Sequence, residues 1–265
     1  MDAALFHAFQ AIAYDQAGIA LRDGKEALVE ARIGRRIRDL GLASAADYLE
    51  FLKADRGGDE LVRFLDAIST NFTSFFREPD HFEHLREQLA ERLEGNPERL
   101  RIWCAAASTG EEPYSLAITL AETLAGREID WRILATDIST RVLAVAKAGR
   151  YQEKQLSRAP AALRKRWFRP TETPGTEEVH PALRERVHFA RLNLAKPPYP
   201  MQGPFDAVFC RNVMIYFDTG VRQALITEIE RLLAPGGLLC IGHSETLAGL
   251  RTSLRPIRPS EYRQA

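Results

Sequence analysis

The sequence is poor in cysteine, and its three cysteines, Cys104, Cys210 and Cys240, each lie within an apolar run. None shows the short paired spacing that zinc sites use, so we expect no metal centre and no disulfide framework. Buried thiols of this kind are typical of a protein from a reducing compartment.

The chain also lacks an excess of either charge and a long hydrophobic run. Lysine and arginine together number 36, as do aspartate and glutamate, so we expect no general attraction to nucleic acid or to an anionic membrane. No apolar run is long enough to span a bilayer, and the first residues, MDAALFHAFQ, carry no basic leader. We therefore expect a cytoplasmic protein, and its 265 residues suffice for one large domain with a smaller one attached.

The first part of the chain, residues 1–70, shows only helical periodicity. Apolar side chains such as Leu5 and Phe9 recur every three or four residues, and Ser44 stands where a helix N-cap is expected. This pattern predicts an all-helical N-terminal domain at 1–70. A linker and a connecting helix are predicted at 71–98.

From residue 99 to residue 265, short apolar runs alternate with amphipathic segments. The runs lie at 101–106, 131–137, 187–192, 205–212 and 237–243. Apolar strands joined through helices are typical of a parallel sheet covered on both faces, so an α/β domain is predicted at 99–265. Residues 151–186 interrupt the alternation with proline, charge and turn formers, which predicts a small inserted antiparallel subdomain. Sheets of this class bind ligands at the carboxyl ends of their strands.

The first predicted strand ends in AAASTG, followed by Glu111 and Glu112. Small residues let a ligand approach the backbone, and Gly110 can make the sharp turn into a helix. The G-x-G-x-x-G pattern of a dinucleotide loop is absent, and two carboxylates disfavour a pyrophosphate. The acidic pair suits a ligand with positive charge or hydroxyl donors; alternatively, the two glutamates only complement the helix dipole.

The second predicted strand ends at Asp137. An acid at this place commonly accepts hydrogen bonds from a ribose, although Asp137 could instead cap the helix that follows. A ribose acid together with carboxylates and no phosphate cradle suits S-adenosylmethionine, which is a cationic nucleoside without phosphates.

Five longer stretches have a more specific likeness. The segments TNFTSFFREPDHF, CAAASTGEEPYS, ATDIS, FDAVFCRNVMIYFD and LAPGGLLCIGHSE resemble, in order, the CheR family of chemotaxis receptor methyltransferases, over roughly residues 5–262. The resemblance implies a helical N-terminal domain and a Rossmann-like class I methyltransferase domain with an inserted antiparallel β-subdomain. It also implies S-adenosylmethionine-dependent methylation of glutamate side chains on the cytoplasmic helices of chemoreceptors, which forms glutamate methyl esters.

The resemblance assigns roles to individual residues of this sequence. By the family pattern, the cofactor contacts are Asn71, Thr73, Arg77, Glu112, Asp137, Asn193, Leu194, Arg211 and Asn212. Arg77 and Tyr216 match the residues that line the methyl-transfer site. Without the resemblance, the residues alone favour a linker ion pair for Arg77 and a core aromatic for Tyr216.

The partner predictions concern the second helix and the inserted segment. Arg32, Arg35 and Arg36 form a stripe beside an apolar helix face, which is either a solvated face or, as the resemblance implies, a docking surface for acidic receptor helices. The stretch WFRPTETPGTEEVHPAL lacks the G-x-G-P loop with which some family members bind a receptor's C-terminal peptide, so we expect no such tether. We also expect a monomer.

Two other functions remain open on the sequence alone. KPPY at 196–199 is similar to the box with which amino-methylating DNA enzymes hold a flipped base, but that box lies at the end of the fourth strand, which here reads CRNVMIY. The neutral net charge also disfavours a surface that binds the phosphates of a nucleic acid. The second alternative is a catalytically silent module that binds S-adenosylmethionine or its product and docks to a receptor.

Overall fold

The computed structural model describes residues 1–55, 57–69, 72–95 and 97–265. Its first part contains the helices α1 (Ala3–Ala17), α2 (Glu26–Asp39), α3 (Ala45–Ala54) and α4 (Asp59–Ile68). Their apolar faces meet in a shared core around Phe6, Phe9 and Phe64. As predicted, Ser44 caps α3 by accepting a hydrogen bond from the Asp47 backbone.

The second part is built on a seven-stranded sheet with the order β6-β2-β1-β7-β8-β10-β9. Its strands are β1 (Arg99–Cys104), β2 (Asp130–Asp137), β6 (Val187–Arg191), β7 (Phe205–Cys210), β8 (Leu233–Ile241), β9 (Arg255–Arg258) and β10 (Glu261–Arg263). The first five in spatial order run parallel, and β9 and β10 form an antiparallel edge. The strand order reverses between β1 and β7, which is the place where open α/β sheets bind ligands.

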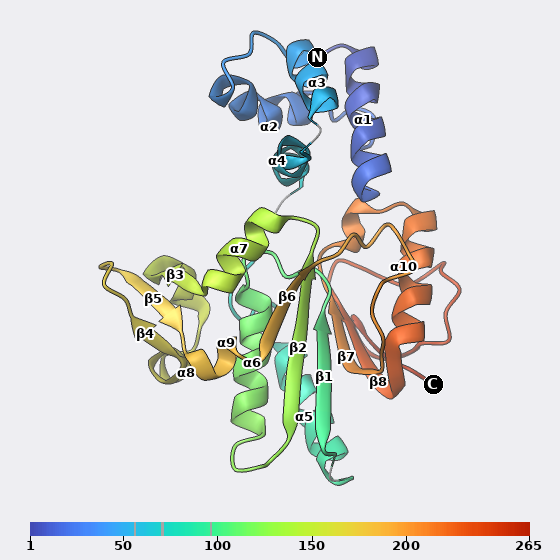
Figure 1. Ribbon diagram of the computed structural model, residues 1–265. Helices are drawn as coiled ribbons and strands as arrows, with labels where there is room; N and C mark the ends of the chain where they lie inside the picture. Colours follow the sequence, from blue (N-terminus) through green and yellow to red (C-terminus); the bar gives the residue numbers. More distant parts are fainter. Residues whose placement is uncertain (56, 70–71, 96) are drawn as a thin grey trace.

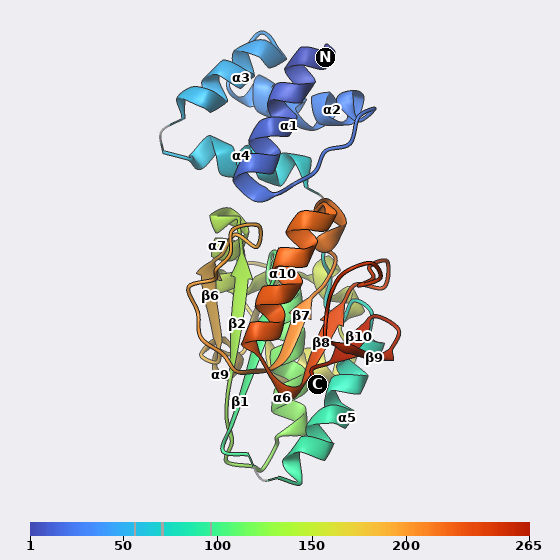
Figure 2. The ribbon, with the colours of Figure 1, turned by 90° about the vertical axis from the view of Figure 1, so that its right-hand side faces the viewer.

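Helices cover both faces of this sheet (Figures 1 and 2). They are α5 (Asp80–Leu93), α6 (Glu111–Thr123), α7 (Thr140–Ala148) and α10 (Thr219–Leu232). Alternate residues of β1 point to opposite faces, so that Ile102 packs in the core with α5 and α6 while Trp103 packs in the core with α10. This two-sided burial explains why the strands read as continuous apolar runs.

The inserted segment forms its own three-stranded antiparallel sheet, with the order β3-β5-β4. Its elements are β3 (Arg150–Gln152), the 3₁₀ helix η1 (Glu153–Arg158), α8 (Ala161–Trp167), β4 (Phe168–Pro170), β5 (Thr176–Val179) and α9 (Pro181–Arg184). Phe75, in the segment after α4, makes edge-on contacts with Tyr151 and Phe168 and so packs against this subdomain.

The helical unit lies over the carboxyl ends of the parallel strands (Figure 1). The chain after α1 meets the segment that follows the 3₁₀ helix η2 (Met214–Tyr216): Ile19 bridges Phe217, and the Ala20 N–H donates to the Tyr216 carbonyl at 2.8 Å. The Asn193 side chain also donates to the Gln16 carbonyl at 2.7 Å. The edge of the sheet that is expected to bind ligand is therefore covered by the helical unit.

Candidate active site

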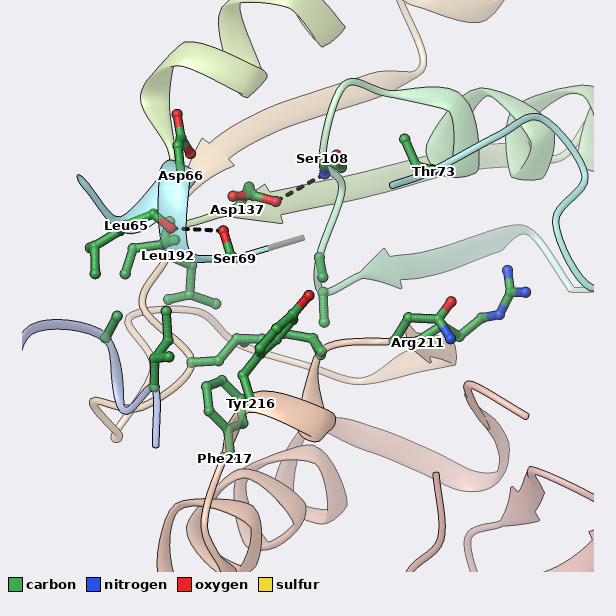
Figure 3. Close-up of a pocket in the computed structure, with 18 of the residues that line it drawn as sticks. Leu65, Asp66, Ser69, Thr73, Ser108, Asp137, Leu192, Arg211, Tyr216 and Phe217 are labelled. Carbon is green, nitrogen blue, oxygen red and sulfur yellow. Dashed lines mark hydrogen bonds between the residues drawn. The ribbon is translucent and has the colours of Figure 1, made fainter. Parts of the chain in front are cut away.

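One cavity lies where β1, β2, β6 and β7 end and α4 and η2 approach them (Figure 3). Among the residues that line it are Thr73, Arg77, Glu112, Asp137, Asn193, Leu194, Arg211, Asn212 and Tyr216. The structure thus brings together the predicted cofactor and methyl-transfer residues that it describes. Asn71, which was predicted with them, lies outside the described residues.

Asp137 stands at the end of β2 with its carboxylate fixed by backbone donors. Oδ2 accepts from the Ser108 N–H and Oδ1 from the Ser139 N–H, both at 2.9 Å. The alternative role as a helix cap is wrong, because Ser139 is the residue whose side chain caps α7. Two backbone bonds orient the carboxylate in the cavity wall while leaving it capacity to accept more.

Ser108, in the loop after β1, fits a polar ligand at this place. Its backbone has φ 47°, a left-handed conformation that is uncommon for a residue with a side chain. Its hydroxyl is buried without a hydrogen-bond partner among the described residues, and it lines the cavity beside Asp137. A left-handed backbone and an unsatisfied buried hydroxyl beside Asp137 are compatible with a polar ligand bound at this place.

The two glutamates that open α6 point in different directions. Glu112 lines the cavity, whereas the buried Glu111 accepts from Thr109 at 2.6 Å and faces Gln155 of η1. The expectation that both face the ligand is therefore wrong for Glu111. Gly110 makes the predicted turn with φ 101°, and a Cβ there would lie 2.5 Å from the Tyr151 hydroxyl oxygen.

Glu112 belongs to an ion-pair network centred on Arg211. The Arg211 side chain is fully buried; Nη1 donates to Glu112 at 2.6 Å, and Nη2 donates to Glu78 at 2.8 Å and to the Arg77 carbonyl. Glu112 also accepts from the Cys104 thiol at 3.2 Å. Arg211, which directly follows β7, thereby links the start of α6 to the segment that carries Arg77.

The pKa values of the carboxyl groups at the site are shifted in different directions. Burial raises the pKa of Asp137, against the backbone hydrogen bonds from Ser139 and Ser108. Burial also raises the pKa of Glu112, against the charge of Arg211. For Glu78, the hydrogen bond and charge of Arg211 outweigh burial and hold the pKa below its usual value. A cationic ligand would therefore favour the ionised form of the two cavity acids, Asp137 and Glu112.

Glu245, which we did not predict, shapes the turn after β7. Its buried carboxylate accepts from the backbone N–H groups of Asn212 at 2.9 Å, Gly242 at 2.6 Å and Ile215 at 3.3 Å. A Cβ on Gly242 would lie 2.3 Å from the Asn212 side-chain nitrogen, so only glycine fits there. These contacts set the position of η2 and hence of Tyr216.

Tyr216 points from η2 toward Asp137 and Ser108 (Figure 3). It lines the cavity instead of packing in the sheet core. Arg77 is partly exposed, at 30% of its side chain, and its Nη1 donates to the Phe72 carbonyl at 2.8 Å. Its nearest carboxylate oxygen belongs to Glu78, 4.0 Å from Nε, and that glutamate is already bonded to Arg211.

The helical unit contributes cavity residues that the sequence did not reveal. Leu65, Asp66 and Ser69 at the end of α4 line the cavity together with Ile19. The Asp66 carboxylate pairs with Arg141 of α7 at 2.8 Å, which links the two parts of the chain beside the site. No sequence motif marked these residues, because their role depends on how the helical unit sits on the sheet.

The predicted arginine stripe on α2 divides into residues of different exposure. Arg36 forms a two-point ion pair with the buried Glu60, at 2.9 and 2.7 Å, and Arg32 donates to the Ile68 and Ser69 carbonyls at 3.0 Å. Arg35 remains 84% exposed, with Asp39 at 3.9 Å. Docking to a partner stays a prediction, and Arg35 is the member of the stripe that is most accessible to one.

The KPPY segment lies in the loop between β6 and β7. Its Tyr199 is buried against Trp103, with ring centres 5.8 Å apart, and its hydroxyl donates to the Leu194 carbonyl at 2.6 Å. A base-gripping aromatic must be accessible, so this tyrosine cannot serve as one.

Comparison with known proteins agrees with this geometry. The family model described as "CheR methyltransferase, SAM binding domain" matches residues 71–262, and that described as "CheR methyltransferase, all-alpha domain" matches residues 4–69. A chemotaxis protein methyltransferase of Escherichia coli is 42% identical over 247 residues, covering 92% of this chain and 85% of the relative. Chemotaxis protein methyltransferase 2 of Pseudomonas aeruginosa is 42% identical over 254 residues, covering 95% and 90%.

The fold and the site define a class I methyltransferase that uses S-adenosylmethionine. This chain belongs to the CheR methyltransferase family. The polar groups of its cavity fit the cofactor, since Asp137 and Glu112 offer carboxylates and Ser108 offers a hydroxyl. No phosphate cradle is present in the described site. Within the described residues, no helix is both long and apolar enough to cross a membrane.

Proposed function

We propose that this protein is a cytoplasmic protein-glutamate O-methyltransferase that forms methyl esters on the cytoplasmic helices of a chemoreceptor. One observation carries the proposal: predicted site residues from the ends of β2, β6 and β7, the start of α6, the linker after α4 and the η2 segment line a single cavity. The relatives that match over most of the chain are named chemotaxis protein methyltransferases, which supports a receptor as the methyl acceptor.

The residues present suit a reaction that needs no general base. A glutamate side chain has a pKa of about 4.3 and is already ionised at neutral pH, so it can attack without losing a proton. When bound, the cofactor supplies a methyl group on a positively charged sulfur. Glu112 lines the cavity and could in principle accept a proton, but it is paired with Arg211. We therefore assign it a binding and orienting role.

The protein's contribution is alignment and the exclusion of water. Opposite charges cancel as the methyl group moves, so a tight clamp on the attacking oxygen would stabilise the starting state and slow the reaction. We assign Arg77 to orienting the cofactor or the non-attacking carboxylate oxygen. We assign Tyr216 to positioning the incoming carboxylate. Asp137 and Ser108 hold the ribose.

The partner is a chemoreceptor helix that docks without a C-terminal tether. The β4–β5 connection, residues 171–175, contains TETPG in place of the G-x-G-P loop, which supports the absence of a tether. Two rival functions make different predictions: a nucleic-acid methyltransferase labels DNA or RNA, and a silent binding module labels nothing.

Mass spectrometry separates these functions. The protein is incubated with S-adenosylmethionine and the cytoplasmic fragment of a chemoreceptor, and peptides are mapped for the added mass of one methylene group. We expect the added mass on glutamate residues, and its loss when those glutamates are changed to glutamine. Bound cofactor with no modified peptide would instead support the silent module.

A further inference from the structure

At the outer rim of the cavity, two side chains without an assigned role in cofactor binding, Phe72 and Arg158, lie beside Arg77. The Phe72 ring lines the cavity although it is 59% exposed. The guanidinium carbon of Arg77 lies 5.6 Å from the ring centre, and that of Arg158 lies 6.0 Å from it. Two cations thus share one exposed aromatic ring.

Arg158 reaches this rim from the inserted subdomain. It is the last residue of η1, it is exposed, and its Nη1 lies 3.4 Å from the Ser74 hydroxyl. Arg164 of the same subdomain, in contrast, pairs with Glu153 and Glu177, at 3.1 and 2.5 Å. Over the described ranges of the chain, Arg158 forms no ion pair with a carboxylate.

Neither cation at the rim is fully neutralised by the protein. Among the residues that the structure describes, Arg77 has a carboxylate partner only in Glu78, at 4.0 Å, and the carboxylate of Glu78 is bonded to Arg211. Like charges held near one ring repel each other, and an anion that contacts both lowers that energy. Because Phe72 and Arg77 line the cavity, such an anion would sit at its mouth.

A helical substrate that presents acidic side chains can reach both the cavity and this rim. On a helix surface, residues three or four positions apart are about 5–6 Å from each other. If the methylated glutamate enters the cavity beside Arg77, a side chain one turn away lies over the rim. An exposed aromatic ring there can contact the apolar part of the same helix.

We infer that Arg158 is a substrate-recognition residue: it binds an acidic side chain three or four positions from the glutamate to be methylated, and Phe72 packs against that helix. The inference rests on the proposed function and adds a sequence preference to it. The inserted subdomain then serves substrate selection directly, through one arginine at the site.

The enzyme-side test compares Arg158→Ala with Lys154→Ala, which removes the same charge from an exposed position of the same 3₁₀ helix. For a receptor fragment that the wild type methylates, we expect Arg158→Ala to raise KM about three- to fivefold, as for a partly exposed charge pair, with kcat within about twofold. Lys154→Ala should match the wild type. Arg158→Lys should be intermediate, because an ammonium keeps the charge and loses the planar stacking.

The substrate-side test changes, one at a time, each acidic residue three or four positions from the methylated glutamate to glutamine. One of these changes should raise KM for the wild type and leave KM unchanged for Arg158→Ala, because the lost partner is the same. Additive effects at every position, or an equal KM for wild type and Arg158→Ala, would overturn the inference.

Two further readouts distinguish substrate recognition by Arg158 from a purely structural role. Calorimetry with S-adenosylhomocysteine should give equal affinity for the wild type and Arg158→Ala; a weakened affinity or a lower melting temperature would show that Arg158 only holds the linker, and would contradict the inference. A wild type that binds S-adenosylhomocysteine yet methylates no receptor fragment would contradict the proposed function itself, and the inference with it.

Discussion

Asp137 and Asp130 are two carboxylates on one strand with different tasks. Asp137 ends β2 in the cavity wall, whereas Asp130 begins β2 and pairs with Arg101 at 2.6 Å. The sequence identified Asp137 because a residue at a strand's carboxyl end is placed by the topology alone. Ser108 was missed because neither its φ nor its unpartnered hydroxyl can be read from a sequence.

The ribose assignment predicts that Asp137→Ala weakens binding of S-adenosylhomocysteine. The loss of a charged hydrogen-bond acceptor should cost about 1.5–3 kcal/mol, measured by calorimetry. Asp130→Ala, at the other end of the same strand, should bind as the wild type does. Equal affinity for wild type and Asp137→Ala would remove this residue from the cofactor site.

The methyl-transfer assignment predicts that Arg77→Ala and Tyr216→Phe lower turnover at saturating cofactor and receptor. Both residues line the cavity; Tyr216 also packs against the core of the helical unit, but Tyr216→Phe keeps the ring, so melting temperatures should change little. Turnover is measured by methyl transfer and stability by thermal unfolding. Wild-type turnover in both variants would mean that neither residue takes part in the chemistry.

At the scale of elements, the apolar runs predicted the strands well because a parallel sheet buried on both faces requires continuous apolar residues. The run at 131–137 became β2, and that at 205–212 became β7, shorter by its last two residues. Those two residues, Arg211 and Asn212, instead make the turn that Glu245 holds, so polar residues at a strand end marked the site. The proposed domain boundaries at residues 70 and 98 stay predictions.

The edge strand β10 predicts a pH-dependent stability. Glu261 packs against His84 and His81 of α5, and burial raises its pKa to about 7 from a usual 4.5. Between these two values, the folded state keeps a proton that the unfolded state has released. Glu261 therefore destabilises the fold progressively as pH rises through this window.

Glu261→Gln removes this titration. Relative to the wild type, its free energy of unfolding should rise by about 1–3 kcal/mol between pH 5 and pH 7.5. Burial lowers the pKa of His81 to about 4 and also lowers that of His84, so their titrations have the opposite sign. Both histidines contact Glu261, so the difference reports Glu261 together with these two neighbours. Denaturant unfolding across this range, with the exposed Glu83→Gln as control, gives the measurement. A constant difference between Glu261→Gln and wild type would contradict the prediction.

At the scale of the whole molecule, the sequence could predict two domains but not how one closes the site of the other. The contacts that do this join residues far apart in the chain, such as the Tyr14 hydroxyl and the Asp218 carboxylate at 2.7 Å. The Arg211 network has the same character, since its partners Glu112 and Glu78 lie about a hundred or more positions away. Periodicity and short motifs carry no information on such pairs.

Because Arg32 and Arg36 are engaged within the helical unit, the docking prediction now concerns Arg35. Arg35→Glu should slow methylation at low receptor concentration, because it reverses an exposed charge that would attract acidic helices, and added salt should diminish the effect. Lys53→Glu, a charge reversal on α3, should have less effect. Arg36→Glu should instead lower the melting temperature, because it leaves the buried Glu60 facing a like charge.

Association rates across a salt series and thermal unfolding of each variant give the measurements. Equal rates for Arg35→Glu and the wild type at low salt would make the α2 stripe a solvated face. A normal melting temperature for Arg36→Glu would show that its ion pair with Glu60 does not stabilise the helical unit.

Base-labile methylation tests the central claim most directly. Wild-type protein, S-adenosylmethionine labelled in its methyl group and membranes that contain a chemoreceptor are incubated together, and the labelled protein is then treated with alkali. Glutamate methyl esters release their label as volatile methanol, and this is the result that we predict. Label that resists alkali, label in nucleic acid, or no transfer despite bound cofactor would contradict the assignment as a protein-glutamate O-methyltransferase.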